Sequence, residues 1–203
     1  MPKSSKSSFE KEIAYHEASH AIIGLSLGRK LPYGVSIIPQ DDGTLGQSSG
    51  DLNSNSEPEY KDVITELYAG YAAQIKFNPN SVQAKDVSGD DDEKAARFLT
   101  WCSGDPIKLE KKLRQKAYKL VDDNWLAIQI LAEELVIRKW IDGQEIDALM
   151  DVIRGEVSLS AYVNFIAYYT RGFMGAEISI QEANEIANRV GKALASGVRD
   201  HAS

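Results

Sequence analysis

The sequence predicts a mainly α-helical protein with a small β-element beside its first helix and extra helices at its C-terminal end. Apolar residues recur at spacings of three and four over most of the 203 residues, which is the period of a helix that packs on one face. A β-type pattern is confined to one short run, "GVSIIP" at 34–39, which Pro39 ends. Hydrophobic residues make up 43% of the chain, enough for the core of one moderate domain or of a domain with an extension.

The first predicted helix covers residues 9–27. Its apolar and histidine positions recur every three or four residues, and Gly28 follows as a stop signal. The preceding segment, 1–8, is polar and serine-rich and lacks the apolar core of a signal peptide, so we expect a disordered N-terminal tail. Residues 40–58 are rich in Gly, Ser, Asp and Asn, which predicts a loop with one short strand near Leu45.

Two further helices are predicted in the middle of the chain. One runs from Ser56 to about Phe77, because Ser56 and Glu59 have the spacing of a capping box. The next begins within "DDDEKAARFLTW" at 90–101, where acidic residues at the N-terminal end suit the helix dipole.

A long helical pattern then starts at Pro106, with Asp105 as the candidate N-cap. It continues to about Trp140, with a bend expected at 122–124. The segment "DGQEIDALMDVI", 142–153, predicts a turn and another helix.

Residues 9–150 are interpreted as one domain, and 151–203 as a helical extension packed on that domain. The extension holds an aromatic-rich helical pattern at 160–169 and a second helix that begins at Ser179. Aromatic residues at helical spacing usually serve the core, and a lid over the functional site is the alternative. The side chains to inspect for such a lid are Tyr168, Tyr169 and Phe173.

Charge and cysteine content exclude several classes of function. A net charge of −7 argues against a nucleic-acid-binding protein, which would normally carry a basic face. The single cysteine, Cys102, excludes an internal disulfide and a cysteine-rich metal site, and it fits a reducing compartment. No apolar run approaches the length needed to span a bilayer. We therefore expect no membrane insertion and a cytoplasmic location.

The motif "HEASH", residues 16–20, holds two of the three histidines. On a helix His16 and His20 lie one turn apart on one face, roughly 5–6 Å between Cβ atoms, so both imidazoles can reach one metal ion at about 2 Å. Glu17 points about 100° away around the helix. It is therefore a poor third ligand, but it is well placed to activate a water molecule at the metal for attack on a carbonyl.

A metal centre of this type needs a third protein ligand. The remaining histidine, His201, is three residues from the end of the sequence, so we expect a carboxylate instead. Glu66 on the second predicted helix is one candidate. The acidic cluster "SGDDDEKAA", 88–96, is the other, although most of its acids are explained by the helix dipole. Spacing alone leaves both candidates open.

Four segments resemble, in order and spacing, the peptidase domain of FtsH, a membrane-anchored AAA zinc metalloprotease. They are "YHEASHAIIG", "VSIIPQDDGTLG", "ITELYAGYAAQIKF" and "DVSGDDDEKAARFL". Residues 117–150 are also similar to the closing helices of that domain, so the resemblance covers about 9–150. The sequence contains no phosphate-binding loop and no AAA module.

The resemblance implies a Zn²⁺-dependent endopeptidase with a helical peptidase fold. By position, His16 and His20 match the zinc-binding histidines and Glu17 matches the catalytic glutamate. Asp91 falls on the aspartate that supplies the third ligand in the family. The strand "VSIIP" resembles the edge strand beside the cleft, on which substrate can lie as an added strand.

Several neighbouring positions depart from the family pattern. A shift of one residue would make Asp90 or Asp92 the third ligand instead. Ser19 replaces a glycine of the family motif, and Gln74 replaces a glutamate. These departures concern substrate handling more than metal binding.

Two functions are consistent with this set of residues. The first is an active zinc endopeptidase that acts on peptides or unfolded protein segments, because the chain has no ATPase of its own to unfold a substrate. The second is a catalytically silent relative that binds zinc and serves as a peptide-binding or regulatory module. A separate ATPase partner or a homo-oligomer is compatible with both.

Overall fold

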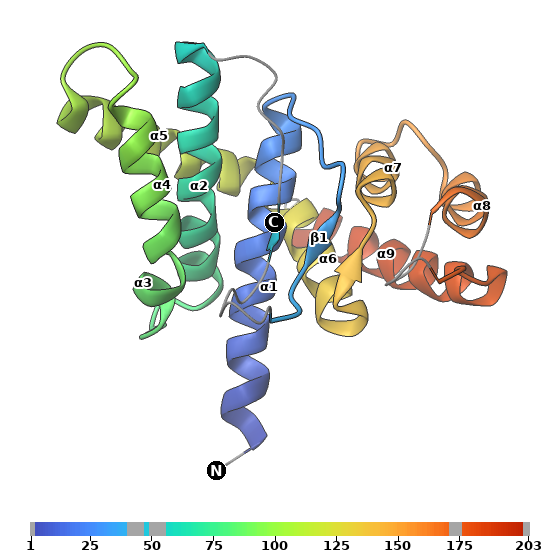
Figure 1. Cartoon of the computed structure of the whole chain (residues 1–203). Helices are drawn as coiled ribbons and strands as arrows, with labels where there is room; N and C mark the ends of the chain where they lie inside the picture. The colour runs from blue at the N-terminus through green and yellow to red at the C-terminus, as the bar shows by residue number, and fades with distance from the viewer. Residues whose placement is uncertain (1–2, 40–46, 49–55, 171–175, 201–203) are drawn as a thin grey trace.

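The computed structural model describes residues 3–39, 47–48, 56–170 and 176–200. As predicted, the fold is mainly α-helical with one small sheet (Figure 1). The described helices are α1 (Lys3–Ser26), α2 (Glu57–Phe77), α3 (Ala84–Val87), α4 (Gly89–Leu99), α5 (Pro106–Asp123), α6 (Trp125–Arg138), α7 (Gly143–Ile153), α8 (Leu159–Tyr169) and α9 (Ile180–Asp200). The strands are β1 (Val35–Ser36), β2 (Gln47–Ser48) and β3 (Trp140–Ile141).

Helix α1 is the central element of the molecule, packed between α2 on one side and α6 on the other (Figure 1). It begins at Lys3, so residues 3–8 are helical and the predicted disordered tail is wrong for them. The physical reason is that this segment has no Gly or Pro to end a helix, and serine and lysine cost little in one. The predicted stop signal lies where expected, because Gly28 follows the helix in a left-handed conformation with φ 81°.

Helices α2, α4 and α5 form one side of the molecule. They share a small apolar cluster, with Ile64, Leu99 and Leu113 from the three helices at its centre. The predicted start of α5 is confirmed, because the Asp105 carboxylate accepts hydrogen bonds from the amides of Ile107 and Lys108 at 3.0 and 3.3 Å. This arrangement holds the first turn of α4 against α1 and α2.

The predicted long helix after Pro106 is interrupted at Asn124, where α5 ends and α6 begins, as the expected bend indicated. The prediction that it continues to about Trp140 holds to within two residues, because α6 ends at Arg138. Lys139 adopts a left-handed conformation with φ 69°, and the chain then turns into β3. The carbonyl of Lys139 accepts a hydrogen bond from Ile37 at 2.9 Å, so pairing with a distant strand prevails over helical continuation.

The sheet has the order β2-β1-β3, and both pairings are antiparallel. Strand β1 therefore lies in the middle, and the expectation that "VSIIP" forms an edge strand is wrong. The predicted strand near Leu45 falls on a position outside the described residues, and β2 follows at 47–48. Gly34 permits the close pairing, because a Cβ atom there would lie 2.2 Å from the carbonyl oxygen of Ile141.

The C-terminal helices belong to the main core. Tyr162 and Ile166 of α8 and Ile186 of α9 are buried in the same apolar cluster as Ile22 of α1 and Leu131 of α6. Helices α8 and α9 lie on the opposite side of α1 from α4 (Figure 1).

Two of the three candidate lid residues are exposed to solvent. Tyr168 and Tyr169 of α8 are 72% and 71% exposed. The third residue, Phe173, lies outside the described residues.

None of the helices in the described part of the chain is both long enough and apolar enough to cross a membrane.

Candidate metal centre

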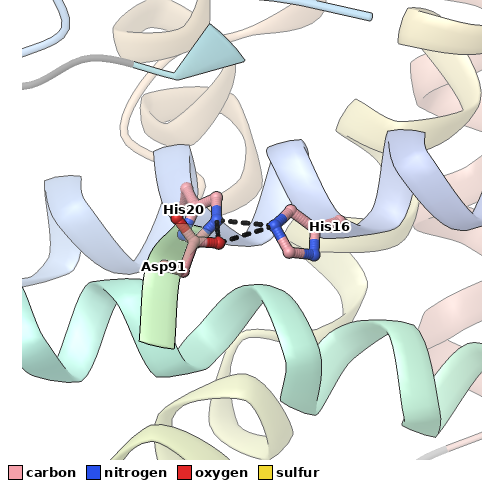
Figure 2. A group of neighbouring side chains, drawn as sticks. All are labelled: His16, His20 and Asp91. Carbon is pink, nitrogen blue, oxygen red and sulfur yellow. Dashed lines mark hydrogen bonds and ion pairs between the residues drawn. The ribbon is translucent and has the colours of Figure 1, made fainter. Parts of the chain in front are cut away.

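Two imidazoles from α1 and one carboxylate from α4 converge inside the molecule. His16 and His20 are one turn apart on the α1 face that packs on α2, and they are only 2% and 6% exposed. Asp91 lies in the first turn of α4, and its side chain is 13% exposed. Figure 2 shows the three side chains pointing toward one another.

The three nearest donor atoms form a compact triangle. His16 Nε2 and His20 Nε2 lie 2.9 and 3.1 Å from Asp91 Oδ2, and the two Nε2 atoms are 2.9 Å apart. Each residue offers one ligand atom, and these atoms all lie within 4.8 Å of one another. The arrangement can hold a metal ion.

The chemistry of the donor set fits a zinc-type centre. His20 Nδ1 lies 2.9 Å from the backbone carbonyl oxygen of Glu66, which can only accept a hydrogen bond. Nδ1 therefore carries the proton, and the lone pair of Nε2 faces the centre in the neutral ring, as metal-binding histidines require. Two imidazole nitrogens and one carboxylate oxygen are a common ligand set of catalytic zinc.

A glycine on α2 makes room for the two rings. A Cβ atom on Gly70 would lie 2.6 Å from both Cε1 and Nε2 of His16 and 2.7 Å from Nε2 of His20. No side chain larger than hydrogen fits there without moving the histidines. Gly70 was not among the predicted site residues, although an isolated glycine inside a long helical pattern can indicate such a close approach.

The structure distinguishes Asp91 from the adjacent acids. Asp92 forms an ion pair with Arg114 at 2.9 Å, and Asp90 is exposed. Asp91 shares the inward face of α4 with the buried Ser88 and Ala95, three residues before it and four after it. Helical spacing from these small buried residues selects Asp91 from the run of acids.

Glu66, the other candidate ligand, has a different environment. Its carboxylate forms a buried ion pair with Arg29 and lies against Gly24, where a Cβ atom would be 3.0 Å from Oε2. Burial raises the pKa of this carboxyl group, and the charge of Arg29 opposes that rise. Glu66 therefore holds the His20 ring through its backbone carbonyl, while its carboxylate pairs with Arg29 and is not one of the three convergent ligand groups.

The electrostatics of the metal-free site are dominated by Asp91. Burial alone would lower the pKa of His20, but the charge and hydrogen bond of Asp91, with the charges of Glu17 and Glu66, raise it to about 9. Burial also disfavours the charged form of Asp91, yet the two imidazoles hold its pKa well below the usual range. A metal ion would replace the proton shared by these three groups.

Glu17, the predicted general base, is 7% exposed and follows His16 directly on α1. Burial raises the pKa of its carboxyl group above the usual value, while the neighbouring histidines lower it. Glu17 is thus a buried carboxyl group beside the three convergent donors and is not one of them.

Ser19 and His201 are two further residues that the sequence singled out. Ser19, which replaces a glycine of the family motif, is fully buried, and its hydroxyl donates to the His16 carbonyl at 2.7 Å. The substitution is therefore accommodated within the helix. His201 lies outside the described residues.

Comparison with known proteins adds no assignment. No protein-family model matches this chain, and no curated protein is similar enough to match it.

Proposed function

We propose that the chain is a zinc-dependent endopeptidase that hydrolyses peptides or unfolded protein segments. The observation that carries the proposal is the convergence of His16, His20 and Asp91 with a buried glutamate, Glu17, beside the first histidine. A purely structural metal site needs its ligands but gains nothing from a carboxyl group in that position.

The residues divide the chemistry between them. His16, His20 and Asp91 would hold the zinc ion, which when bound would supply Lewis-acid chemistry for the scissile carbonyl and for water. Glu17 accepts the proton of the attacking water and delivers it to the leaving amine. The raised pKa of Glu17 suits both steps, because a group that titrates nearer to neutral pH can accept and return a proton.

A peptide substrate needs a backbone to align with. Strand β1 is paired on both sides, so it offers no edge for strand addition. Strand β2 packs against α1 and, within the described residues, pairs only with β1. The outer edge of β2 is the part of the sheet on which we propose that an extended peptide lies.

The substitution Glu17→Gln tests the proposal directly. We expect hydrolysis of an unfolded protein such as casein to fall about 10²- to 10⁴-fold, because general acid–base catalysis is lost. Zinc content, measured by atomic absorption, should stay at the wild-type value. Asp91→Ala is the matched comparison, and it should lose both zinc and hydrolysis.

A catalytically silent zinc protein is the alternative. The pairing of β1 on both sides favours it, since the strand expected to bind substrate is covered. Full zinc occupancy of the wild-type protein without turnover of any of several unfolded substrates would reject the peptidase proposal in favour of this alternative.

A further inference from the structure

A second group of buried polar residues lies one helical turn from the metal centre, between α1 and α2. Glu12, one turn before His16 on α1, is 6% exposed. Its Oε1 accepts a hydrogen bond from Asn78 at 2.7 Å, and its Oε2 accepts from Gln74 at 3.1 Å and from Ser81. Burial opposes ionisation of Glu12, but these three donors hold the pKa of its carboxyl group below the usual value.

The group contains an unused acceptor. Gln74 is completely buried, and its Nε2 is engaged with Glu12, which fixes the orientation of the amide. Its Oε1 has no hydrogen-bond partner among the described residues. A buried amide oxygen without a donor costs about 1–3 kcal/mol, so its retention calls for an explanation.

The metal centre contains an unused donor position. His16 Nδ1 is buried and likewise has no partner within the described part of the chain. Figure 2 shows this nitrogen on the side of the ring that points away from His20 and Asp91. In the second histidine, the equivalent nitrogen is engaged with the carbonyl of Glu66.

Helix geometry brings these two atoms to the same level of the α1–α2 interface. A helical side chain leans over the turn N-terminal to its own Cα, so the His16 ring lies toward the turn that carries Glu12. On α2 the His16 ring contacts Gly70, and Gln74 follows one turn later on the same face. Glu12 contacts Gln74 directly. The unpaired acceptor of Gln74 and the unpaired nitrogen of His16 therefore belong to the same α1–α2 interface, on adjacent turns, with no direct hydrogen bond between them.

We propose that Gln74 is a positioning residue for the metal centre, with its Oε1 linked to His16 Nδ1–H through one bridging water molecule, since no direct hydrogen bond joins the two atoms. Glu12 accepts a hydrogen bond from Gln74 Nε2 and so holds the Gln74 amide in the required orientation. The link fixes the Nδ1–H tautomer of His16, so that the Nε2 lone pair faces His20 and Asp91. This inference rests on the metal-binding part of the proposed function and does not depend on peptidase activity.

The substitution Gln74→Met tests the link, because it removes the acceptor at similar volume. We expect zinc affinity, measured by competition with a chromogenic chelator, to weaken about 10- to 100-fold, the usual effect of losing such a partner. The matched control is Gln129→Met on α6, where the glutamine hydrogen-bonds to Tyr15, whose ring stacks on Trp125. It should leave zinc affinity within about twofold of the wild type.

Nitrogen-15 NMR of the zinc-loaded wild-type protein measures which nitrogen of His16 carries the proton and how fast that proton exchanges. Neither property would depend on Gln74 if this residue only packed the two helices together. We expect His16 to carry its proton on Nδ1, with slow exchange against solvent, and Gln74→Met to make that proton exchange faster. Because the wild type itself is measured, the test stands even if the variant does not fold.

Two results would overturn the inference. One is zinc bound through Nδ1 of His16 in the wild type; the other is unchanged zinc affinity together with unchanged proton exchange in Gln74→Met. Casein hydrolysis is a separate measurement. If the peptidase proposal failed, the zinc-affinity and NMR results could still be interpreted.

Discussion

At the scale of residues, small differences in position decide which groups can meet at the metal centre. Gly70 allows the two imidazoles to approach α2, and the single aspartate that faces inward from α4 completes the donor set. Both contacts depend on single residues and not on the course of the helices. Substitutions at these positions should therefore alter zinc binding far more than secondary structure.

The substitution Gly70→Ala should weaken zinc binding at least tenfold and destabilise the zinc-free protein by about 1–3 kcal/mol, the usual cost of overpacking. The reason is that the new Cβ atom would lie 2.6 Å from His16 Nε2. Chelator competition and urea unfolding measure the two effects. Gly89→Ala is the control, because a Cβ atom there meets nothing within 4 Å. Equal zinc affinity in the two variants would contradict the packing argument.

The raised pKa of His20 predicts how the stability of the zinc-free protein depends on pH. A histidine whose pKa is about 9 in the folded state and 6.5 in the unfolded state stabilises the fold in its protonated form. That stabilisation is complete below about pH 6.5 and is lost as the pH rises through 9. The free energy of unfolding, measured with urea in the presence of a chelator, should therefore fall over this range.

The variant Asp91→Asn serves as the control for this pH dependence. Asp91 is the largest influence that raises the pKa of His20, so removing its charge should flatten the decline in stability. A decline of equal steepness in the variant would show that another group titrates.

At the scale of elements, helix boundaries follow local sequence signals except where a distant segment competes. Asp105 and Pro106 start α5 as the sequence indicates. The end of α6 is different, because Lys139 leaves the helix so that residues 140–141 can pair with β1. A capping signal acts within one turn, whereas strand pairing depends on where the partner lies.

The substitution Asp105→Ala should lower the free energy of unfolding by about 1 kcal/mol, since it removes an N-cap from an exposed helix end. Asp105→Ser, which keeps a capping oxygen, should recover most of that loss. Urea unfolding measures both variants, and zinc affinity should not change in either. A loss as large in the serine variant as in the alanine variant would show that charge, not capping, matters there.

At the scale of the whole molecule, one core joins α1, which carries the two histidines, to the last helix. Ile186 of α9 and Ile22 of α1 are both fully buried in the same cluster. Glu134 of α6 also accepts two hydrogen bonds from Arg189 of α9, at 2.6 and 2.7 Å. The C-terminal helices should therefore unfold together with the site that they do not touch.

The substitution Ile186→Ala should cost about 2–5 kcal/mol, the usual range for a fully buried isoleucine. Ile180→Ala on the same helix, where the side chain is 51% exposed, should cost less than about 1 kcal/mol. Circular dichroism and tryptophan fluorescence should report one shared transition for each protein. Separate transitions would instead indicate that α8 and α9 form an independent unit.

The sequence by itself determined the helical class and the pair of histidines one turn apart, because both depend on periodicity within a single helix. It also indicated the start of α5 and the break at Asn124, which depend on residues within one turn. The choice between Asp91 and Glu66 stayed open on spacing alone. Tertiary structure decided it, since Arg29 pairs with the Glu66 carboxylate while α4 packs with Asp91 facing the histidines.

Tertiary structure also decided that β1 is a central strand and that Gly70 lies against the two imidazoles. These features depend on how α1, α2 and the strands are placed relative to one another. Such placement is fixed by packing between segments far apart in the chain. The spacing of apolar residues within any one segment therefore cannot predict it.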